Sequence, residues 1–562
     1  MIRLFETHHV RDTEELSGKL WDFTPMEEGY EDQAQKVMVP GCLENLPGFG
    51  NYRGYASYET AFEAEGTIRL EFKGVSHFAK VYVDGELAAE HYGSYTPFSL
   101  CRKQLKKGMH QLKVETDNAF REEYALDMPN DYMSYGGISR GVVLERLREA
   151  YIRYVHFTPL YQENGAWVCE IEAVCENLSE VPAKAEVIVR IAGTEVRMEP
   201  QTLNTEGTTV YRTQTKISGV TAWSMESPVL YTMDAKLVLE GQVIDDWIDR
   251  VGFRTVEIRK NQILLNGRAI RVKGFCRHED HPQYGCALPA EAIAYDLKQI
   301  KDMGANSIRT THYPNDELFL DLCDEMGILV WEENHARGIE VERMQNPYFE
   351  SQCEEVIREM ITAHYNHPSI YIWGILNECG SESEYGRTCY QAQYELIRKL
   401  DQSRPTTSAS CKFYKDLCQD LPDVCSWNIY PYWYEEKTAT EMAGDLLKWI
   451  RSEGNGGEKP FVISEIGAGG IYGFRDPSHD IWSEELQAEI LEKQLREISA
   501  MEDCVGLYIW QFCDVRVSRI DWAIRRPKSR NNKGVVDEYR RPKMAYHVVK
   551  EVFGALPDYR EE

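Results

Sequence analysis

The spacing of apolar residues along the chain changes after about residue 256. Before that point, short segments such as 67–75 (TIRLEFKGV) and 110–118 (HQLKVETDN) alternate apolar with polar residues between Gly, Asn, Asp and Pro. This alternation predicts half-buried β-strands, and Asp84-Gly85 between two apolar runs predicts a hairpin. Residues 1–150 are therefore predicted to form one β-sandwich. Residues 151–256 keep this pattern and predict a second, immunoglobulin-like β-sandwich.

After residue 256, short apolar runs alternate with segments of helical periodicity, such as 291–304 and 350–365. The eight apolar runs are 269–275, 306–310, 328–333, 369–376, 405–410, 424–430, 461–466 and 505–512. Strands that alternate with helices indicate a parallel sheet, and eight such units match the size of one (β/α)8 barrel. Residues 257–562 are therefore predicted to form a TIM barrel.

Composition and charge narrow the range of partners. The chain has 63 Lys and Arg against 91 Asp and Glu, a net charge of -28, which disfavours nucleic acid as a partner. No apolar run is long enough to span a membrane, and residues 1–12 lack the apolar core of a signal peptide. The 15 cysteines form no C-x-x-C pair, which suggests reduced thiols. We therefore expect a cytoplasmic protein without membrane contact.

Two of the predicted barrel strands end at a glutamate. Asn377-Glu378 follows the fourth strand, and Glu465 lies at the end of the seventh. Active sites of such barrels lie at the C-terminal ends of the strands, and glycoside cleavage needs two carboxyl groups. Either glutamate alone could be a helix cap, but the pair predicts glycoside hydrolysis. A non-catalytic carbohydrate-binding protein is the alternative from another class.

Motifs along the whole chain resemble glycoside hydrolase family 2. Segments 39–45 (VPGCLEN), 81–85 (VYVDG), 92–100 (YGSYTPFSL) and 135–142 (YGGISRGV) are similar to the sugar-binding-type jelly roll of this family. In the barrel, the similar segments are 266–280, 311–333 and 403–407. The resemblance implies a retaining mechanism with Glu378 as acid/base and Glu465 as nucleophile. Such cleavage needs no metal or other cofactor, and we predict none.

Two further segments resemble the β-uronidase branch of this family. Asn531-x-Lys533 is similar to the motif with which β-uronidases hold the sugar carboxylate, since an ammonium supplies charge and an amide a directional hydrogen bond. Residues 428–434 (NIYPYWY) are similar to the segment that places a tyrosine near that carboxylate and another near the nucleophile. The substrate-binding residues implied by the resemblance are Asp131, His312, Asn377, Asn428, Tyr430, Tyr434, Trp510, Asn531 and Lys533.

Each of these residues has a plainer interpretation. Residues 525–533 could be a solvated basic loop, and Trp510 could serve packing alone. Whether Arg526 or Arg530 joins the pocket stays open.

The chain also departs from the β-glucuronidase pattern. Segments 277–282 (RHEDHP) and 311–316 (THYPND) look more like the β-galactosidases of the family. Arg337 stands after the third strand, where β-glucuronidases usually have small residues, and its guanidinium could favour the galacto epimer. We therefore predict a retaining exo-β-hexuronidase acting on a small β-uronide or an oligosaccharide end. A β-galacturonide is favoured over a β-glucuronide, and a neutral β-galactosidase is the alternative. The resemblance also implies a homo-oligomer.

Overall fold

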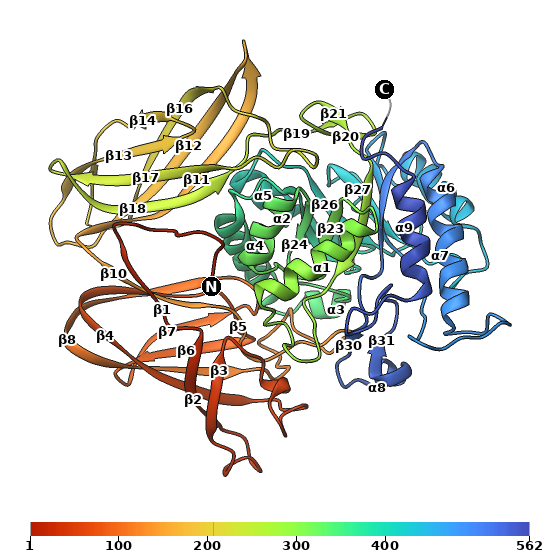
Figure 1. Ribbon diagram of the computed structural model, residues 1–562, viewed down its shortest axis with the longest axis horizontal. Helices are drawn as coiled ribbons and strands as arrows, with labels where there is room; N and C mark the ends of the chain where they lie inside the picture. The colour runs from red at the N-terminus through yellow and green to blue at the C-terminus, as the bar shows by residue number, and fades with distance from the viewer. Residues whose placement is uncertain (1, 206, 561–562) are drawn as a thin grey trace.

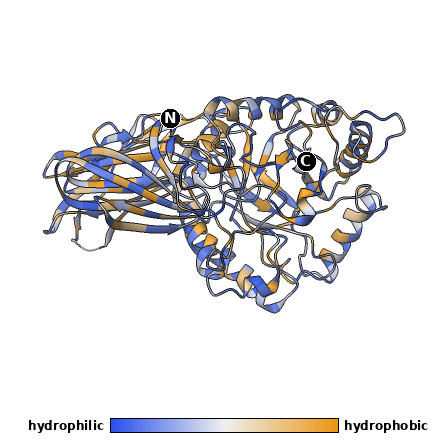
Figure 2. Cartoon of the chain, turned by 90° about the horizontal axis from the view of Figure 1, so that it is seen from below, coloured by the Kyte–Doolittle hydropathy of each residue, from blue (hydrophilic) through white to orange (hydrophobic). Residues whose placement is uncertain are grey.

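The computed structural model describes residues 2–205 and 207–560 as two β-rich units followed by a closed barrel (Figure 1). The two β-rich units lie next to each other at one end of the molecule, and the barrel forms the other end. Hydrophobic and hydrophilic residues alternate along the strands of the β-rich end (Figure 2). Because of this alternation, each sheet has one apolar face that can pack into a hydrophobic core. The predicted multidomain architecture is confirmed.

The first unit is built on an eight-stranded antiparallel sheet. Its core contains Trp21, Phe62, Ile68 and Leu112, which are almost completely buried. Asp84 and Gly85 both have positive φ and join β6 to β7, so the predicted hairpin is confirmed. The strands of this unit are β1 (Asp12–Glu15), β2 (Lys19–Pro25), β3 (Gln35–Val39), β4 (Tyr55–Phe72), β5 (Val75–Ser76), β6 (Phe78–Val83), β7 (Glu86–Tyr92), β8 (Phe98–Asp117), β9 (Gly137–Ile138) and β10 (Val142–Leu147).

The second unit consists of two antiparallel sheets that share one hydrophobic core. The first sheet contains β11 (Ala150–Glu163), β12 (Ala166–Asn177) and β16 (Thr208–Ser218). The second contains β13 (Ala183–Ile191), β14 (Thr194–Arg197), β15 (Gln201–Leu203), β17 (Tyr231–Leu239) and β18 (Gln242–Val251). A small sheet of β19 (Val256–Arg259), β20 (Gln262–Leu265) and β21 (Arg268–Ala269) leads into the barrel.

The barrel closes through eight parallel strands, each of which overlaps one of the predicted strands. They are β22 (Val272–Arg277), β23 (Ser307–Thr310), β24 (Leu329–Glu333), β25 (Ile370–Asn377), β26 (Thr406–Ser410), β27 (Val424–Asn428), β28 (Phe461–Ile466) and β29 (Cys504–Ile509). The helices are α1 (Ala290–Asp302), α2 (Glu317–Met326), α3 (Val341–Met344), α4 (Phe349–His364), α5 (Glu384–Leu400), α6 (Ala439–Ser452), α7 (Glu484–Ser499), α8 (Asp521–Ile524) and α9 (Met544–Gly554). β30 (Val515–Arg516) pairs with β31 (Arg530–Asn531) beyond β29.

The segment between β8 and β10 connects the first unit to the mouth of the barrel. Arg140 donates to Glu279 Oε2 at 2.9 Å and to the carbonyl oxygen of Pro314 at 2.7 Å. Tyr132 stacks on His278 with ring centroids 4.6 Å apart. These contacts bring residues 130–132 from the first unit to the C-terminal ends of the barrel strands.

Two further observations concern sequence predictions. None of the helices in the described part of the chain is both long and apolar enough to cross a membrane. The cysteines are free thiols, and most of them are buried.

Candidate active site

A cavity of about 270 Å³ lies at the C-terminal ends of the barrel strands. The predicted site residues that line it are Asp131, Arg337, Glu378, Asn428, Tyr430, Tyr434, Glu465, Trp510 and Lys533. The remaining three, Asn377, His312 and Asn531, lie directly behind the lining and contact it. Cys411, Phe413, Glu435 and Met442 also line the cavity and were not predicted.

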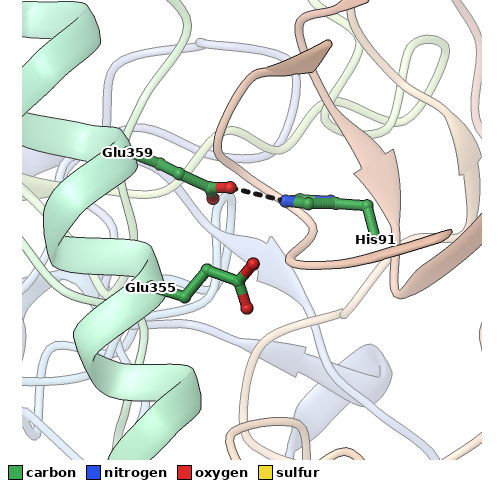
Figure 3. A group of neighbouring side chains, drawn as sticks. All are labelled: His91, Glu355 and Glu359. Carbon is green, nitrogen blue, oxygen red and sulfur yellow. Dashed lines mark hydrogen bonds and ion pairs between the residues drawn. The ribbon is translucent and has the colours of Figure 1, made fainter. Parts of the chain in front are cut away.

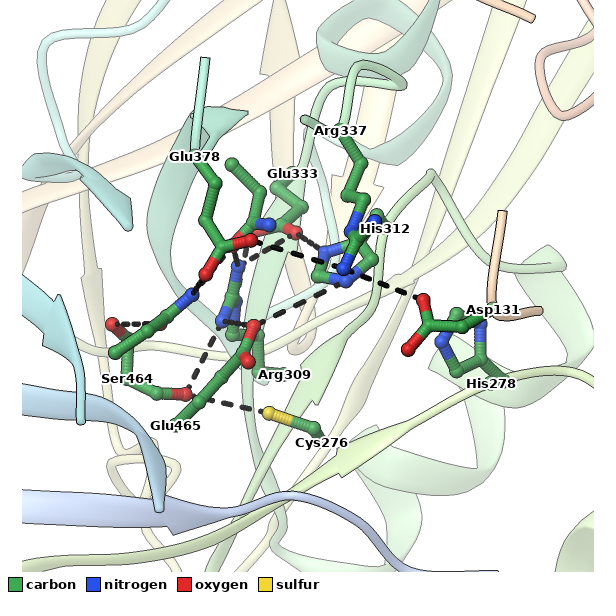
Figure 4. Close-up of polar contacts among 12 residues, drawn as sticks. Asp131, Cys276, His278, Arg309, His312, Glu333, Arg337, Glu378, Ser464 and Glu465 are labelled. Carbon is green, nitrogen blue, oxygen red and sulfur yellow. Dashed lines mark hydrogen bonds and ion pairs between the residues drawn. The ribbon is translucent and has the colours of Figure 1, made fainter. Parts of the chain in front are cut away.

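Glu378 and Glu465 come from strands on different sides of the barrel. Glu378 follows the last residue of β25 and has a φ of 54°, which side-chain-bearing residues seldom adopt. Its N–H donates to the carbonyl oxygen of Ala409 at 2.9 Å, which ties this turn to the end of β26. Glu465 lies within β28. Both carboxyl groups are directed toward the same space (Figure 4).

Arg309 on β23 lies beneath this space and hydrogen-bonds to several of the residues around it (Figure 4). Its side chain is fully buried and donates to both carboxylate oxygens of Glu333, at 2.9 and 3.0 Å. It also donates to Asn377 Oδ1 at 2.8 Å and to Glu465 Oε1 at 3.1 Å. One planar guanidinium therefore fixes Glu465 and Asn377 relative to each other. Sequence reasoning missed Arg309, although a charged residue inside an apolar strand needs a buried partner.

Glu465 is held at both oxygens. Arg309 occupies Oε1, and Tyr430 Oη donates to Oε2 at 2.6 Å. Burial, followed by the neighbouring charge of Glu378, raises the pKa of Glu465 to about 7, although Arg309 and Tyr430 act in the opposite direction. Glu465 therefore titrates near neutral pH in the free protein.

Glu378 contacts a neutral donor and a cation. Asn428 Nδ2 donates to Glu378 Oε1 at 2.9 Å, and Ser464 Oγ in turn donates to Asn428 Oδ1 at 2.7 Å. Arg337 Nη2 lies 3.8 Å from Glu378 Oε2. Arg337 itself follows β24 and is held by backbone pairing with Asn377. This arrangement leaves one carboxyl oxygen of Glu378 facing the cavity beside a guanidinium.

Lys533 forms a buried cationic corner of the cavity. Its Nζ donates to Tyr434 Oη at 2.6 Å and lies 4.4 Å from the ring centroids of both Tyr430 and Tyr434. Burial lowers the pKa of Lys533. Within residues 2–205 and 207–560, no carboxylate lies within ion-pair distance of Lys533. This corner is therefore suited to an anionic group of a ligand.

Asp131 enters the cavity from the first β unit. Arg526 Nη2 and Asn531 Nδ2 donate to its Oδ2 at 2.9 and 3.0 Å, and Arg337 Nη2 lies 3.3 Å from its Oδ1. Burial opposes ionisation, but Arg337, Arg526 and Lys533 lower the pKa of Asp131 to about 2. Asp131 is therefore a carboxylate at neutral pH. Arg526, not Arg530, is among the described residues that line the cavity.

Trp510 forms an aromatic side of the cavity, and His312 packs behind it. Their rings stack with centroids 5.1 Å apart and an interplanar angle of 19°. His312 Nδ1 lies 2.9 Å from Glu333 Oε1. Burial, and then the charges of Arg309 and Arg337, lower the pKa of His312 well below its usual range, so this imidazole is neutral. Trp510 both packs on His312 and lines the cavity.

Side chains that could hold a metal ion lie elsewhere. His91 on β7 meets Glu355 and Glu359 on α4, with His91 Nε2 2.9 Å from Glu359 Oε1 (Figure 3). A second, buried group consists of Asp321, Asp324 and His367. In the described part of the chain, neither group contains a residue that lines the cavity.

A (β/α)8 barrel that carries two facing glutamates and a polar cavity at its mouth defines a glycoside hydrolase. The sequence agrees with this class: residues 256–557 match the model for the TIM barrel domain of glycosyl hydrolases family 2. Residues 150–254 match a second model of glycosyl hydrolases family 2. The chain belongs to glycosyl hydrolase family 2.

Similar proteins include several named β-galacturonidase or β-glucuronidase. A crystal structure of a β-galacturonidase from Eisenbergiella tayi bound to galacturonate is 55% identical, with a TM-score of 0.97 and 100% of both chains covered. A β-glucuronidase from Streptococcus agalactiae is 26% identical over 98% of both chains. A protein of Formosa agariphila is 28% identical over 91% of this chain. This chain spans only 65% of the length of that relative.

Proposed function

We propose that the protein is a retaining exo-β-hexuronidase. The observation that carries this proposal is the environment of Lys533, a buried ammonium that contacts a phenol and two aromatic rings but no carboxylate of the described chain. A buried ammonium without a carboxylate at ion-pair distance is costly, and a sugar carboxylate would supply one together with a charge-assisted hydrogen bond. The similarity to proteins named β-galacturonidase and β-glucuronidase supports the same substrate class.

The two glutamates would carry out a double displacement. Ionised Glu465 attacks the anomeric carbon while Glu378 donates its proton to the leaving oxygen. A glycosyl-enzyme on Glu465 results. Glu378 then takes a proton from water, which attacks the same carbon and restores free Glu465 with net retention. We expect the two carboxyl groups to lie about 5–5.5 Å apart, as retaining enzymes require.

Neighbouring residues would orient the two glutamates and bind the sugar. Arg309 and Tyr430 hold both oxygens of Glu465, so the nucleophile is oriented before the sugar arrives. Asn428 holds Glu378 from the opposite side. Asp131 Oδ1 and Asn377 Nδ2 would bind sugar hydroxyls, since neither atom has a hydrogen bond within the described residues. Trp510 would support the ring face.

The C4 configuration of the sugar would be read by Arg337. Its guanidinium lies between Asp131 and Glu378 and therefore beside the hydroxyls that Asp131 would bind. This position, together with the similarity to a β-galacturonidase, favours a β-galacturonide over a β-glucuronide. A small cavity of about 270 Å³ suits one terminal sugar and hence exo-cleavage.

Two broader expectations complete the proposal. We expect a homo-oligomer, because relatives in this family commonly assemble. We also expect a cytoplasmic location, because most of the cysteines are buried free thiols.

The test compares kcat/KM for nitrophenyl β-D-galacturonide, β-D-glucuronide and β-D-galactoside. We expect both uronides to exceed the galactoside, with the galacturonide first. A galactoside that is hydrolysed better than either uronide would make the protein a neutral β-galactosidase and refute the role of Lys533. A glucuronide preference would leave the hexuronidase intact and remove Arg337 as a selector for the galacto epimer.

A further inference from the structure

Arg337 makes its shortest polar contact outside the cavity lining. Its Nη1 donates to Asn130 Oδ1 at 2.7 Å, whereas its Nη2 lies 3.3 Å from Asp131 Oδ1 and 3.8 Å from Glu378 Oε2. Its Nε is buried and has no partner among the described residues. Asn130 is therefore the partner that fixes the orientation of this guanidinium.

Asn130 is itself firmly held. Its residue is 3% exposed, and its carbonyl oxygen accepts from the N–H of Ser518 at 3.1 Å. Ser518 Oγ donates to the carbonyl oxygen of Tyr132 at 2.8 Å, so Ser518 hydrogen-bonds to the backbone on both sides of Asp131. Asn130 is not among the described residues that line the cavity. Asn130 therefore contacts Arg337 but is not placed to contact the sugar.

The hydrogen bond to Asn130 has a specific consequence for Arg337. Asp131 and Glu378 both attract the guanidinium, and attraction between charges strengthens in a buried site. An arginine side chain has many rotamers, and without the hydrogen bond to Asn130 it would be free to move toward either carboxylate. Asn130 binds Nη1 of Arg337, and Nη2 stays between the two carboxylates.

We propose that Asn130 is a positioning residue that sets the sugar selectivity of the cavity through Arg337. This inference rests on the proposed function, in which Arg337 reads the C4 configuration. The residues that determine sugar selectivity would then include one from the first β unit, because Asn130 lies between β8 and β9.

The experiment is a double-mutant cycle of Asn130→Ala and Arg337→Ala in the full-length protein. The readouts are kcat/KM and the ratio of galacturonide to glucuronide turnover. We expect Asn130→Ala to lower kcat/KM on the preferred sugar about tenfold and to bring the ratio toward that of Arg337→Ala. In the Arg337→Ala background the same change should alter kcat/KM less than about twofold, because coupled residues are not additive.

Two further variants separate positioning from folding. Asn130→Asp keeps an acceptor for Arg337 and should restore most of the ratio. Met128→Leu changes a side chain on the same segment with little change in volume and should leave the ratio unchanged. If Asn130→Ala does not fold, Asn130→Ser, whose side chain is shorter, replaces it in the cycle.

The outcomes distinguish this inference from the proposed function. Equal losses from Asn130→Ala with and without Arg337 would overturn the positioning role. If the wild-type protein hydrolyses only a neutral glycoside, the proposed function fails. The cycle is then measured on that glycoside, where a coupling between the two residues still supports positioning and additivity still refutes it.

Discussion

At the residue scale, Glu378 and Glu465 have different proposed roles, and these roles predict different behaviour of their mutants. Glu465→Gln should abolish turnover of all substrates, because no nucleophile remains. Glu378→Gln should slow hydrolysis of poor leaving groups by about 10²–10⁴, the usual contribution of a general acid. An activated dinitrophenyl glycoside needs little protonation and should still form the glycosyl-enzyme.

Steady-state and burst kinetics of both variants check this assignment, and azide should rescue only Glu378→Gln. A Glu465→Gln variant that retains substantial turnover would exclude Glu465 as the nucleophile.

Lys533 is expected to act on the uronide carboxylate alone. Lys533→Ala removes a charge-assisted hydrogen bond of roughly 1.5–3 kcal/mol, so kcat/KM on a β-uronide should fall by about 10- to 150-fold. Turnover of the matching neutral galactoside should change little. Lys528→Ala is the matched control, because Lys528 is exposed on the same loop. Equal losses on the acidic and the neutral sugar would contradict carboxylate recognition.

The raised pKa of Glu465 predicts a pH dependence. Because this pKa is about 7, Glu465, the proposed nucleophile, becomes protonated as the pH falls through 7, and kcat/KM should fall with it. The pH profile of kcat/KM, which reports the free enzyme, measures this acid limb. Glu378→Gln removes the second largest cause of the raised pKa, so its acid limb, measured on an activated substrate, should move to lower pH. An unchanged limb would show that Glu378 does not act on Glu465.

At the scale of elements, the cavity depends on how neighbouring strands end. β23 carries Arg309, which bonds to Glu333 of β24, Asn377 of β25 and Glu465 of β28. Arg309→Lys keeps the charge but loses the planar fork, so it cannot reach these partners together. We expect kcat to fall by at least about tenfold with a smaller effect on KM, because the nucleophile is no longer oriented. Kinetics at saturating substrate check this, and a loss confined to KM would contradict it.

The strands and the two glutamates were predictable because their signals are local. Apolar runs and the glutamates that follow them are visible in the sequence, and all eight barrel strands were located. Arg309 and Phe413 were missed because their roles depend on contacts between distant elements. Arg526 was left open for the same reason, since its partner Asp131 lies 395 positions away. The domain boundaries at 150 and 256 stay predictions.

At the scale of the whole molecule, charge is distributed unevenly. The chain carries a net charge of -28, yet Arg337, Arg526 and Lys533 lie together around Asp131 in a cavity that three glutamates also line. In a low-dielectric cavity these three cations act strongly on a nearby carboxylate despite the acidic surface. An acidic substrate would therefore be attracted at short range, and added salt should weaken its binding only moderately.

The first β unit completes this cavity, so its docking should matter for both stability and activity. Arg140 is 4% exposed and pairs with Glu279, which is 2% exposed on the barrel side. Arg140→Ala leaves Glu279 buried without its counter-charge, which typically costs about 3–5 kcal/mol. It also loosens the segment that carries Asp131, so kcat/KM should fall together with the midpoint of urea unfolding.

Arg146→Ala is the matched control for this test. Arg146 lies on β10 of the same unit and pairs with Asp12 and Glu14 at the surface, where such pairs contribute about 0–1 kcal/mol. The control should therefore keep both the unfolding midpoint and kcat/KM close to those of the wild-type protein. Similar losses in the two variants would mean that the buried pair does not dock the first unit. A lower midpoint with unchanged kcat/KM in Arg140→Ala would mean that Asp131 keeps its place without this contact.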